Sequence, residues 1–144
     1  MSQISRSALV PYSAEQMYRL VNDVNSYPEF LPGCTGSRVL DASNNQMTAS
    51  VDVSKAGISK TFVTRNTLTN NQSIQMQLVD GPFRKLSGGW RFTALSDEAC
   101  KVELNLDFEF TNMLVELAFG RIFKELASSM VQAFTQRAKE VYSA

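Results

Sequence analysis

The sequence contains no histidine, and Cys34 and Cys100 are its only cysteines. A zinc site of cysteine and histidine is therefore excluded, and so is a catalytic triad or general base that uses histidine. Neither sign of charge is in excess, because 14 lysines and arginines balance 14 aspartates and glutamates. A nucleic-acid-binding protein usually carries surplus positive charge, so we expect no DNA partner, although a local basic patch is compatible with this balance.

Long apolar runs are also missing. Residues 2–6 lack the apolar core of a signal peptide, and no apolar run approaches the length that spans a bilayer. We therefore expect a cytoplasmic protein with reduced cysteines and at most peripheral contact with a membrane. The 144 residues, 44% of them hydrophobic and 19% charged, predict a single globular domain over residues 1–144.

The most informative feature of the chain is a change of period at Thr111. Residues 102–110 alternate between apolar even positions and polar odd positions. This alternation predicts an antiparallel strand with one face on a core. We expect Phe108 to be buried on this strand, and Glu103 and Glu109 to be exposed.

After Thr111, apolar residues recur at steps of three and four over residues 115–141, which predicts a helix of about 30 residues and about 45 Å. A helix this long with one apolar side must lie across a sheet, and Ile122 should be mostly buried against that sheet. Gly120 lies inside the helix at a cost of about 1 kcal/mol relative to alanine. It permits either close packing on the sheet or room for a ligand ring.

The rest of the chain predicts a first strand at residues 4–10, two short helices and a meander of strands. Residues 13–16 have the form of a capping box, and residues 26–31 indicate the second helix, with Pro28 in its first turn. Five further strands are predicted at residues 36–41, 47–53, 59–68, 74–78 and 86–94. This order predicts an α+β fold of helix-grip architecture, with a curved antiparallel sheet wrapped around the long C-terminal helix.

Three segments carry a resemblance to a known family. They are residues 26–34 (SYPEFLPGC), 53–62 (VSKAGISKTF) and 80–86 (DGPFRKL), the last followed by Trp90 and Phe92. Together they resemble the START-like family of polyketide cyclase-like and coenzyme Q-binding proteins over essentially the whole chain. Residues 117–142 are similar to the bacterial ribosome-association toxins of that family.

The resemblance implies a helix-grip fold with a hydrophobic cavity. For mitochondrial members it implies ubiquinone binding in support of respiration, and for the bacterial toxins it implies binding to the large (50S) ribosomal subunit and a block of 70S association. Our primary interpretation is a non-catalytic protein that holds ubiquinone or a related polyprenyl lipid. The alternative is a toxin-like translation inhibitor, and the resemblance does not choose between the two.

Large apolar residues on the predicted inward faces are the candidates for lining such a cavity. They are Tyr27, Phe30, Leu31, Phe62, Met76, Phe83, Trp90, Phe108, Phe119, Ile122, Phe123 and Leu126. Apolar walls with a few polar groups suit a quinone or lipid, and we expect no other cofactor and no metal. The alternative for each of these side chains is plain core packing.

Basic residues in two turns are candidates for the cavity mouth or for a docking surface: Lys55, Arg84 and Lys85. A larger basic face for ribosomal RNA would combine them with Lys60, Arg65, Arg91, Arg121 and Lys124. The alternative is a scattered, solvated surface. No acid or base has an evident partner near the expected cavity, so we predict no catalytic residue.

Overall fold

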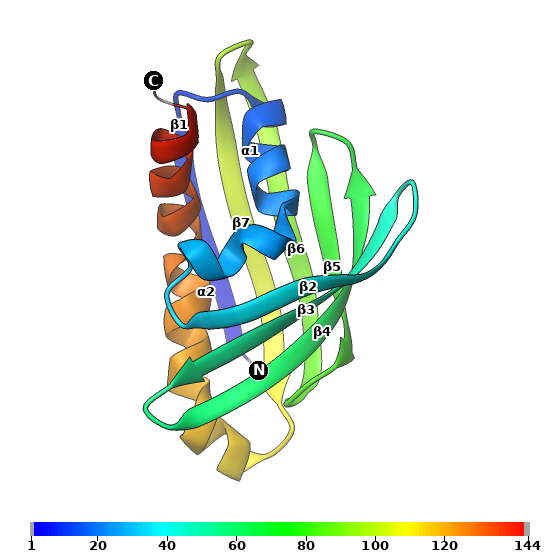
Figure 1. The fold of residues 1–144 in the computed structure, drawn as a ribbon, viewed down its shortest axis with the longest axis vertical. Helices are drawn as coiled ribbons and strands as arrows, with labels where there is room; N and C mark the ends of the chain where they lie inside the picture. The colour runs from blue at the N-terminus through cyan, green and yellow to red at the C-terminus, as the bar shows by residue number, and fades with distance from the viewer. Residues whose placement is uncertain (1, 143–144) are drawn as a thin grey trace.

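The computed structural model describes residues 2–142. Its elements follow in the order β1 (Ser2–Val10), α1 (Ala14–Asn22), the 3-10 helix η1 (Val24–Glu29), β2 (Cys34–Ala42), β3 (Gln46–Lys55), β4 (Ile58–Thr69), β5 (Ser73–Asp80), β6 (Phe83–Ser96), β7 (Ala99–Phe110) and α2 (Met113–Tyr142). Figure 1 shows α2 running along one side of the molecule, with α1 beside its C-terminal half.

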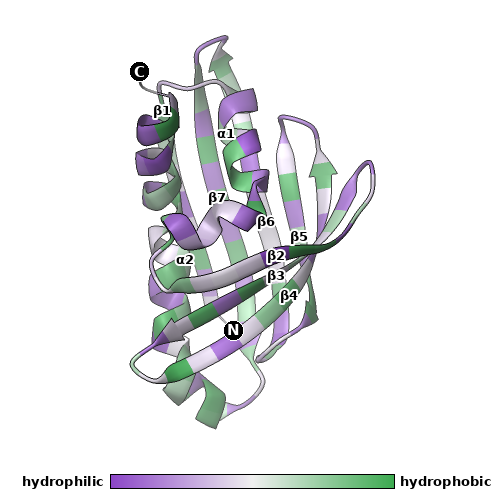
Figure 2. Cartoon of the chain, viewed as in Figure 1, coloured by the Kyte–Doolittle hydropathy of each residue, from purple (hydrophilic) through white to green (hydrophobic). Residues whose placement is uncertain are grey.

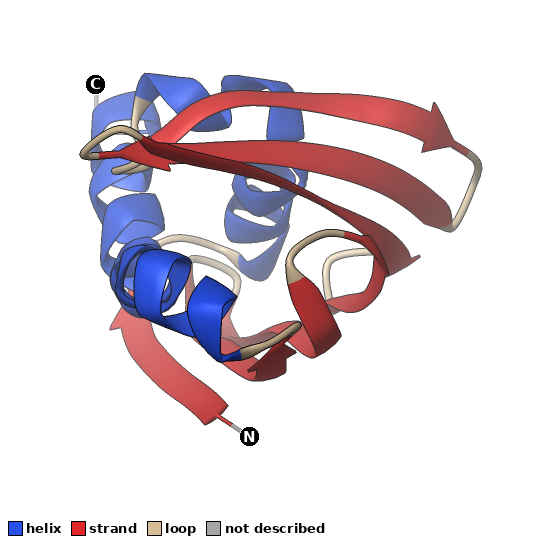
Figure 3. Cartoon of the chain, turned by 90° about the horizontal axis from the view of Figure 1, so that it is seen from below, coloured by secondary structure: helices blue, strands red, loops and turns tan. Residues whose placement is uncertain are grey.

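The strands form one antiparallel sheet in the order β1-β7-β6-β5-β4-β3-β2. Figure 3 shows this sheet curling around the helices, so that its concave face and α2 enclose the core. The predicted α+β helix-grip fold is therefore confirmed. Figure 2 shows hydrophobic and hydrophilic residues alternating along the strands, which is the pattern expected of a sheet with one face on a core.

The junction of β7 and α2 forms as its sequence period predicts. Phe108 is fully buried on the inner face of β7, but Ile122 on α2 is only half-buried. Glu103 and Glu109 lie on the opposite, outer face as the register predicts, but they are only partly exposed, because their side chains keep 27% and 41% of their accessible surface. Since β7 lies between β1 and β6, side chains of both neighbours cover its outer face.

The N-terminal helix begins as predicted. The backbone N–H of Gln16 donates to Ser13 Oγ at 3.1 Å, and the N–H of Ser13 donates to Gln16 Oε1 at 2.9 Å, which completes a capping box. The second short helix differs from the prediction, because it is a 3-10 helix over Val24–Glu29 rather than residues 26–31. Its tighter turn ends where the N–H groups of Phe30 and Leu31 both donate to the carbonyl of Tyr27.

Two glycines allow β6 to pass closely between its neighbours. A Cβ on Gly88 would lie 2.1 Å from the carbonyl oxygen of Asn105 on β7, and a Cβ on Gly89 would lie 2.0 Å from that of Ile74 on β5. No side chain fits at those distances, and Gly88 also has a φ of +127°. The close approach of β6 to both neighbouring strands at this point therefore depends on glycine.

Candidate functional site

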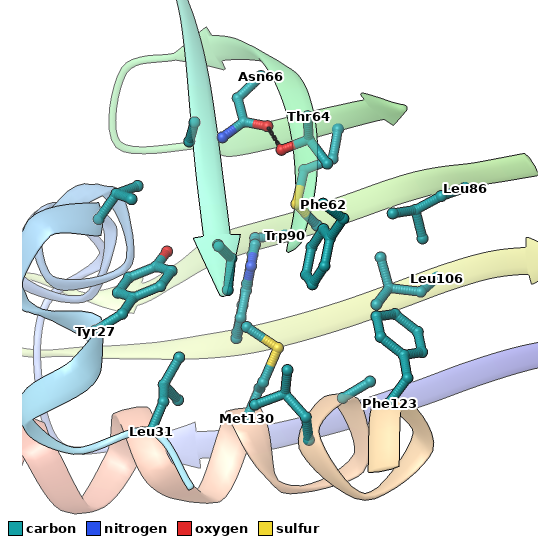
Figure 4. A pocket seen from close by; sticks show the side chains of 16 residues that line it. Tyr27, Leu31, Phe62, Thr64, Asn66, Leu86, Trp90, Leu106, Phe123 and Met130 are labelled. Carbon is teal, nitrogen blue, oxygen red and sulfur yellow. Dashed lines mark hydrogen bonds between the residues drawn. The ribbon is translucent and has the colours of Figure 1, made fainter. Parts of the chain in front are cut away.

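An internal cavity of about 60 Å³ lies between the concave face of the sheet and α2. Figure 4 shows its lining side chains, which come from η1, from the strands and from α2. They are Val24, Tyr27, Leu31, Ala49, Val51, Phe62, Thr64, Asn66, Met76, Leu86, Trp90, Leu106, Phe123, Leu126, Ala127 and Met130. None of these residues carries a formal charge, so the site offers an apolar surface with few polar groups.

The structure brings part of the predicted lining together. The predicted residues that line the cavity are Tyr27, Leu31, Phe62, Met76, Trp90, Phe123 and Leu126. The predicted residues that do not line it are Phe30, Phe83, Phe108, Phe119 and Ile122. The sequence identified the inward face of each element, but not how far along that face the cavity extends.

Phe83, Phe108 and Phe119 instead belong to an aromatic cluster beside the cavity. The ring centroid of Phe123 lies 4.8 Å from that of Phe83 and 5.0 Å from that of Phe108, both in edge-to-face contact. A Cβ on Gly120 would lie 3.4 Å from the ring of Phe110. Of the two roles considered for this glycine, the structure shows close packing of α2 on the sheet.

Phe30 lies outside the cavity because its ring packs on α2 instead. Its ring packs edge-to-face on Phe134 at 5.1 Å, and the guanidinium of Arg137 lies 5.0 Å from its centroid. Arg137 in turn donates to Glu29 Oε1 at 2.6 Å. These contacts dock the end of η1 on α2 rather than exposing Phe30 to a ligand.

Several lining residues were not among the predicted ones: Val24, Ala49, Val51, Thr64, Asn66, Leu86, Leu106, Ala127 and Met130. Most of them lie on the inward faces that the periodicity of the sequence predicts, so this periodicity could have identified them as lining residues. Thr64 and Asn66 are the informative cases, because they follow Phe62 at steps of two on β4 and must share its inward face. Because both side chains are polar, the sequence pattern did not identify them as inward-facing.

The polar groups of the cavity are the Thr64–Asn66 pair, the Tyr27 hydroxyl and the indole N–H of Trp90. Thr64 Oγ1 donates to Asn66 Oδ1 at 2.9 Å, and each residue is only 5% exposed. The buried Tyr27 hydroxyl donates to the carbonyl of Val21 in the last turn of α1. Burial raises the pKa of Tyr27 well above its ordinary value, with further contributions from Cys34 and Asp23, so this hydroxyl stays protonated at neutral pH.

The cavity is smaller than an organic ligand requires. Ligand pockets usually enclose about 300–1,000 Å³, and a cavity of about 150 Å³ can admit benzene. Met76 and Met130, which are only half-buried, stand at its wall on β5 and α2. Unbranched methionine side chains change rotamer readily, so their movement is the simplest way to enlarge the space.

The candidate basic residues of the two turns are used differently. Lys55 Nζ donates to Glu125 Oε2 at 2.8 Å, and this hydrogen bond and charge lower the pKa of the Glu125 carboxyl. Arg84 lies 3.8 Å from Glu109 and donates to the carbonyl of Thr111 at 3.3 Å. Lys85 is exposed and, within residues 2–142, takes part in no ion pair.

The larger set of basic residues does not form one face. Arg65 and Arg91 alternate with the inward-facing residues of β4 and β6, so they lie on the outer, convex face of the sheet. Arg121 and Lys124 lie on the exposed side of α2, next to Glu125. The sheet separates these two groups, so of the two alternatives the structure fits scattered basic residues better than a single basic face.

Neither metal chemistry nor a spanning helix is indicated for the described part of the chain. Residues 2–142 contain no group of three or more cysteine, aspartate or glutamate side chains that could hold a metal ion. Cys34 and Cys100 are both buried, and burial raises the pKa of each thiol. In the same part of the chain, no helix is long and apolar enough to cross a membrane.

A curved antiparallel sheet that grips a long helix around an apolar cavity defines a START-like, helix-grip protein. The chain belongs to the family described as polyketide cyclase / dehydrase and lipid transport, whose model matches residues 10–135.

Two relatives differ in what their names state. The chain is 78% identical, over all of its length and 91% of the relative, to ribosome association toxin RatA of Escherichia coli strain K12. It is 29% identical, over 97% of its length and 59% of the relative, to the mitochondrial coenzyme Q-binding protein COQ10 homolog B of Xenopus laevis. The names of these relatives describe a toxin and a binding protein rather than an enzyme.

The Zhui aromatase/cyclase from Streptomyces sp. R1128 shares the fold. The two structures superpose with a TM-score of 0.86 over 99% of this chain and 96% of that one, at 17% identity. At this identity the likeness shows the fold alone.

Proposed function

We propose that this protein associates with the ribosome and restrains translation, with the large (50S) subunit as its partner and a block of 70S association as its effect. The observation that carries the proposal is the 78% identity over the whole chain to a ribosome association toxin. A ribosomal partner also implies that the protein acts in the cytoplasm. The zero net charge means that docking must depend on a local surface rather than on overall attraction.

The convex face of the sheet is the surface that suits ribosomal RNA best. Arg65, Lys85 and Arg91 lie on it, and within residues 2–142 none of them forms an ion pair. Across the strands, Arg65 faces Gln77 and Thr48, whereas Arg91 faces Ser73 on β5 and Glu103 on β7. Arginines without an ion pair, beside amide and hydroxyl groups, are suited to contacts with phosphate and sugar oxygens, and Arg65 has the more favourable surroundings of the two.

Charge reversal tests this surface with a matched control. Arg65→Glu/Arg91→Glu should weaken co-sedimentation with the large subunit at a given salt concentration. The slope of log affinity against log salt concentration should become shallower by about one for each phosphate contact that is lost. Arg121→Glu/Lys124→Glu makes the same change of charge on α2 and should leave co-sedimentation near that of the wild type. Equal behaviour of the two variants would contradict docking through the convex face.

The cavity favours a second function, the non-catalytic binding of a neutral apolar ligand such as ubiquinone or a related polyprenyl lipid. The supporting observation is an internal apolar space between sheet and helix in a chain related to a coenzyme Q-binding protein. Burial of apolar ligand surface would supply about 25 cal/mol per Å² before the cost of binding. No charged side chain lines the cavity, so the proposed role is carriage rather than acid–base catalysis.

Filling the cavity tests the second function without disturbing the first. Ala127 is buried on α2 and lines the cavity, so Ala127→Leu should occupy the space that a ligand needs. Copurification of quinone, measured by lipid extraction and chromatography, should be lost, whereas co-sedimentation with ribosomes should persist. Wild-type quinone content in this variant would contradict a ligand site between the sheet and α2.

A further inference from the structure

The buried polar pair on β4 has hydrogen-bonding capacity that the described residues leave unused. Thr64 Oγ1 donates its proton to Asn66 Oδ1 at 2.9 Å. Among residues 2–142, the two N–H groups of the Asn66 amide have no hydrogen-bond partner. Figure 4 shows the amide nitrogen of Asn66 on the side away from Thr64, at the edge of the group of lining side chains.

An unused donor in an apolar site has an energetic cost. Asn66 as a residue is only 5% exposed, but its amide nitrogen is not fully enclosed, because Asn22 Oδ1 is the only fully buried side-chain nitrogen or oxygen atom of residues 2–142 that has no partner. The nitrogen therefore has room for a small hydrogen-bonding group beside it, and a buried amide that finds none costs about 1–3 kcal/mol. A leucine or valine at the same inward position would avoid this cost while filling the same space. The cost is offset if an acceptor atom reaches the amide when the cavity is occupied.

The surrounding strand geometry holds the pair in place. The ladder between β4 and β5 changes register next to Thr64, since Val63 pairs with Asp80 but Thr64 pairs with Leu78. The extra residue, Val79, forms a bulge, a feature that often turns side chains toward binding sites. Met76 lies opposite Asn66 on β5, so the movable wall of the cavity is directly beside the amide.

We propose that Asn66 is the polar anchor of the cavity and that its amide holds a carbonyl oxygen of a neutral, flat, apolar ligand, so that an oxidised quinone binds in preference to the reduced quinol. This inference rests on the proposed ligand-binding function. Quinone oxygens only accept hydrogen bonds, which matches the free amide N–H groups, whereas each quinol hydroxyl also carries a proton that needs an acceptor. Asn66 Oδ1 already receives one hydrogen bond from Thr64, so it has less capacity left for that proton.

The same lining selects against charged lipids. Among the residues of the cavity there is no lysine or arginine to neutralise a carboxylate, and an unpaired buried charge is far more costly than an unpaired amide. A fatty acid should therefore bind much more weakly than a quinone of similar apolar surface.

Trp90 provides the readout, because it lines the cavity and is the only tryptophan in the chain. A ubiquinone with one isoprenyl unit, its dithionite-reduced quinol kept without oxygen, and oleate would each be titrated while tryptophan fluorescence is recorded. We expect the quinone to bind at least about tenfold more tightly than the quinol or oleate, since a buried site built to pair a polar group rejects analogues that leave it unpaired.

Three variants isolate the amide. Asn66→Leu/Thr64→Val removes both polar groups without leaving either unpaired, and should lower quinone affinity about tenfold and abolish the preference over quinol. Thr64→Val alone keeps the amide donors and frees Asn66 Oδ1, so quinone affinity should hold while quinol affinity rises. Gln75→Leu lies on the outer face of β5 and should change neither affinity.

A measurement on the wild type keeps the test independent of variant folding. In ¹⁵N-labelled protein, the side-chain amide resonances of Asn66 should shift on addition of the quinone and remain unshifted with oleate. If quinone and quinol bind equally and these resonances do not move, the role of Asn66 is wrong although ligand binding stands. If no probe changes Trp90 fluorescence or any cavity resonance, the ligand-binding function itself is wrong, and the amide is satisfied by water alone.

Discussion

Lys55 Nζ donates to Glu125 Oε2 at 2.8 Å, and this contact joins the β3–β4 hairpin to α2. The hairpin forms part of the grip of the sheet on the helix, so the ion pair links two walls that must separate if a ligand is to enter between them. Arg121 also approaches Glu125, at 3.5 Å, from within α2.

Removing this link should loosen the hairpin without unfolding the protein. Both partners are exposed, and exposed ion pairs contribute little to global stability. Lys55→Gln should therefore leave the melting temperature nearly unchanged but speed amide hydrogen exchange over residues 54–59. Arg19→Gln, which breaks an exposed pair with Glu15 on α1, is the control. Unchanged exchange in the hairpin would show that the link does not restrain it.

The same ion pair predicts how the stability of the β3–β4 hairpin changes with pH. The lowered pKa of Glu125 means that its stabilising effect is present above the ordinary carboxyl pKa and is lost as pH falls through the lowered value. Amide hydrogen exchange over residues 54–59, corrected for the intrinsic effect of pH on the exchange rate, should therefore become faster when the wild-type protein is acidified. The same acidification should change the exchange rate less in Lys55→Gln. Equal acceleration in both proteins would contradict this assignment.

Tyr27 should contribute a buried hydrogen bond to stability. Tyr27→Phe leaves the Val21 carbonyl without the hydroxyl that it now accepts from, and we expect a loss of about 1–3 kcal/mol in urea denaturation. Because burial raises its pKa, the stabilising effect is complete below the ordinary tyrosine pKa and is lost as pH rises above it. A variant as stable as the wild type would contradict the contribution of this bond.

Gly88 should tolerate no side chain. Gly88→Ala places a Cβ 2.1 Å from the Asn105 carbonyl oxygen, so β6 must shift or separate from β7, and soluble yield and denaturation midpoint should both fall sharply. Gly57→Ala is the control, because its φ of +83° costs about 1–2 kcal/mol but its Cβ would meet nothing within 4 Å. Equal effects at both positions would show that the positive φ, rather than the close approach, requires glycine at Gly88.

The sequence predicts the fold well because its periods are long and uninterrupted. The alternation over 102–110 and the helical stripe over 115–141 specify one apolar face each, and two such faces in sequence have few ways to be buried together. Less was predictable where the backbone departs from regularity. The bulges near Thr64 and Arg84 and the 3-10 geometry of η1 leave no clear pattern in the sequence.

The site was only partly predictable for a related reason. Periodicity shows which side chains point inward, but not which of them pack against each other and which face an empty space. Phe108 and Phe119 therefore appeared equivalent to Phe123, although only Phe123 lines the cavity. Asn66 was not among the predicted lining residues, since polar side chains in a half-buried strand usually face water.

Sucrose-gradient sedimentation of the wild-type protein with separated ribosomal subunits tests the central claim most directly. At low salt the protein should co-migrate with the large subunit and not with the small subunit, and the amount bound should fall steeply as salt is raised because phosphate contacts release counterions. Adding the protein before the subunits are mixed should reduce the 70S peak. If the protein stays at the top of the gradient even at low salt, the ribosomal function is wrong for this chain and the ligand-binding function remains.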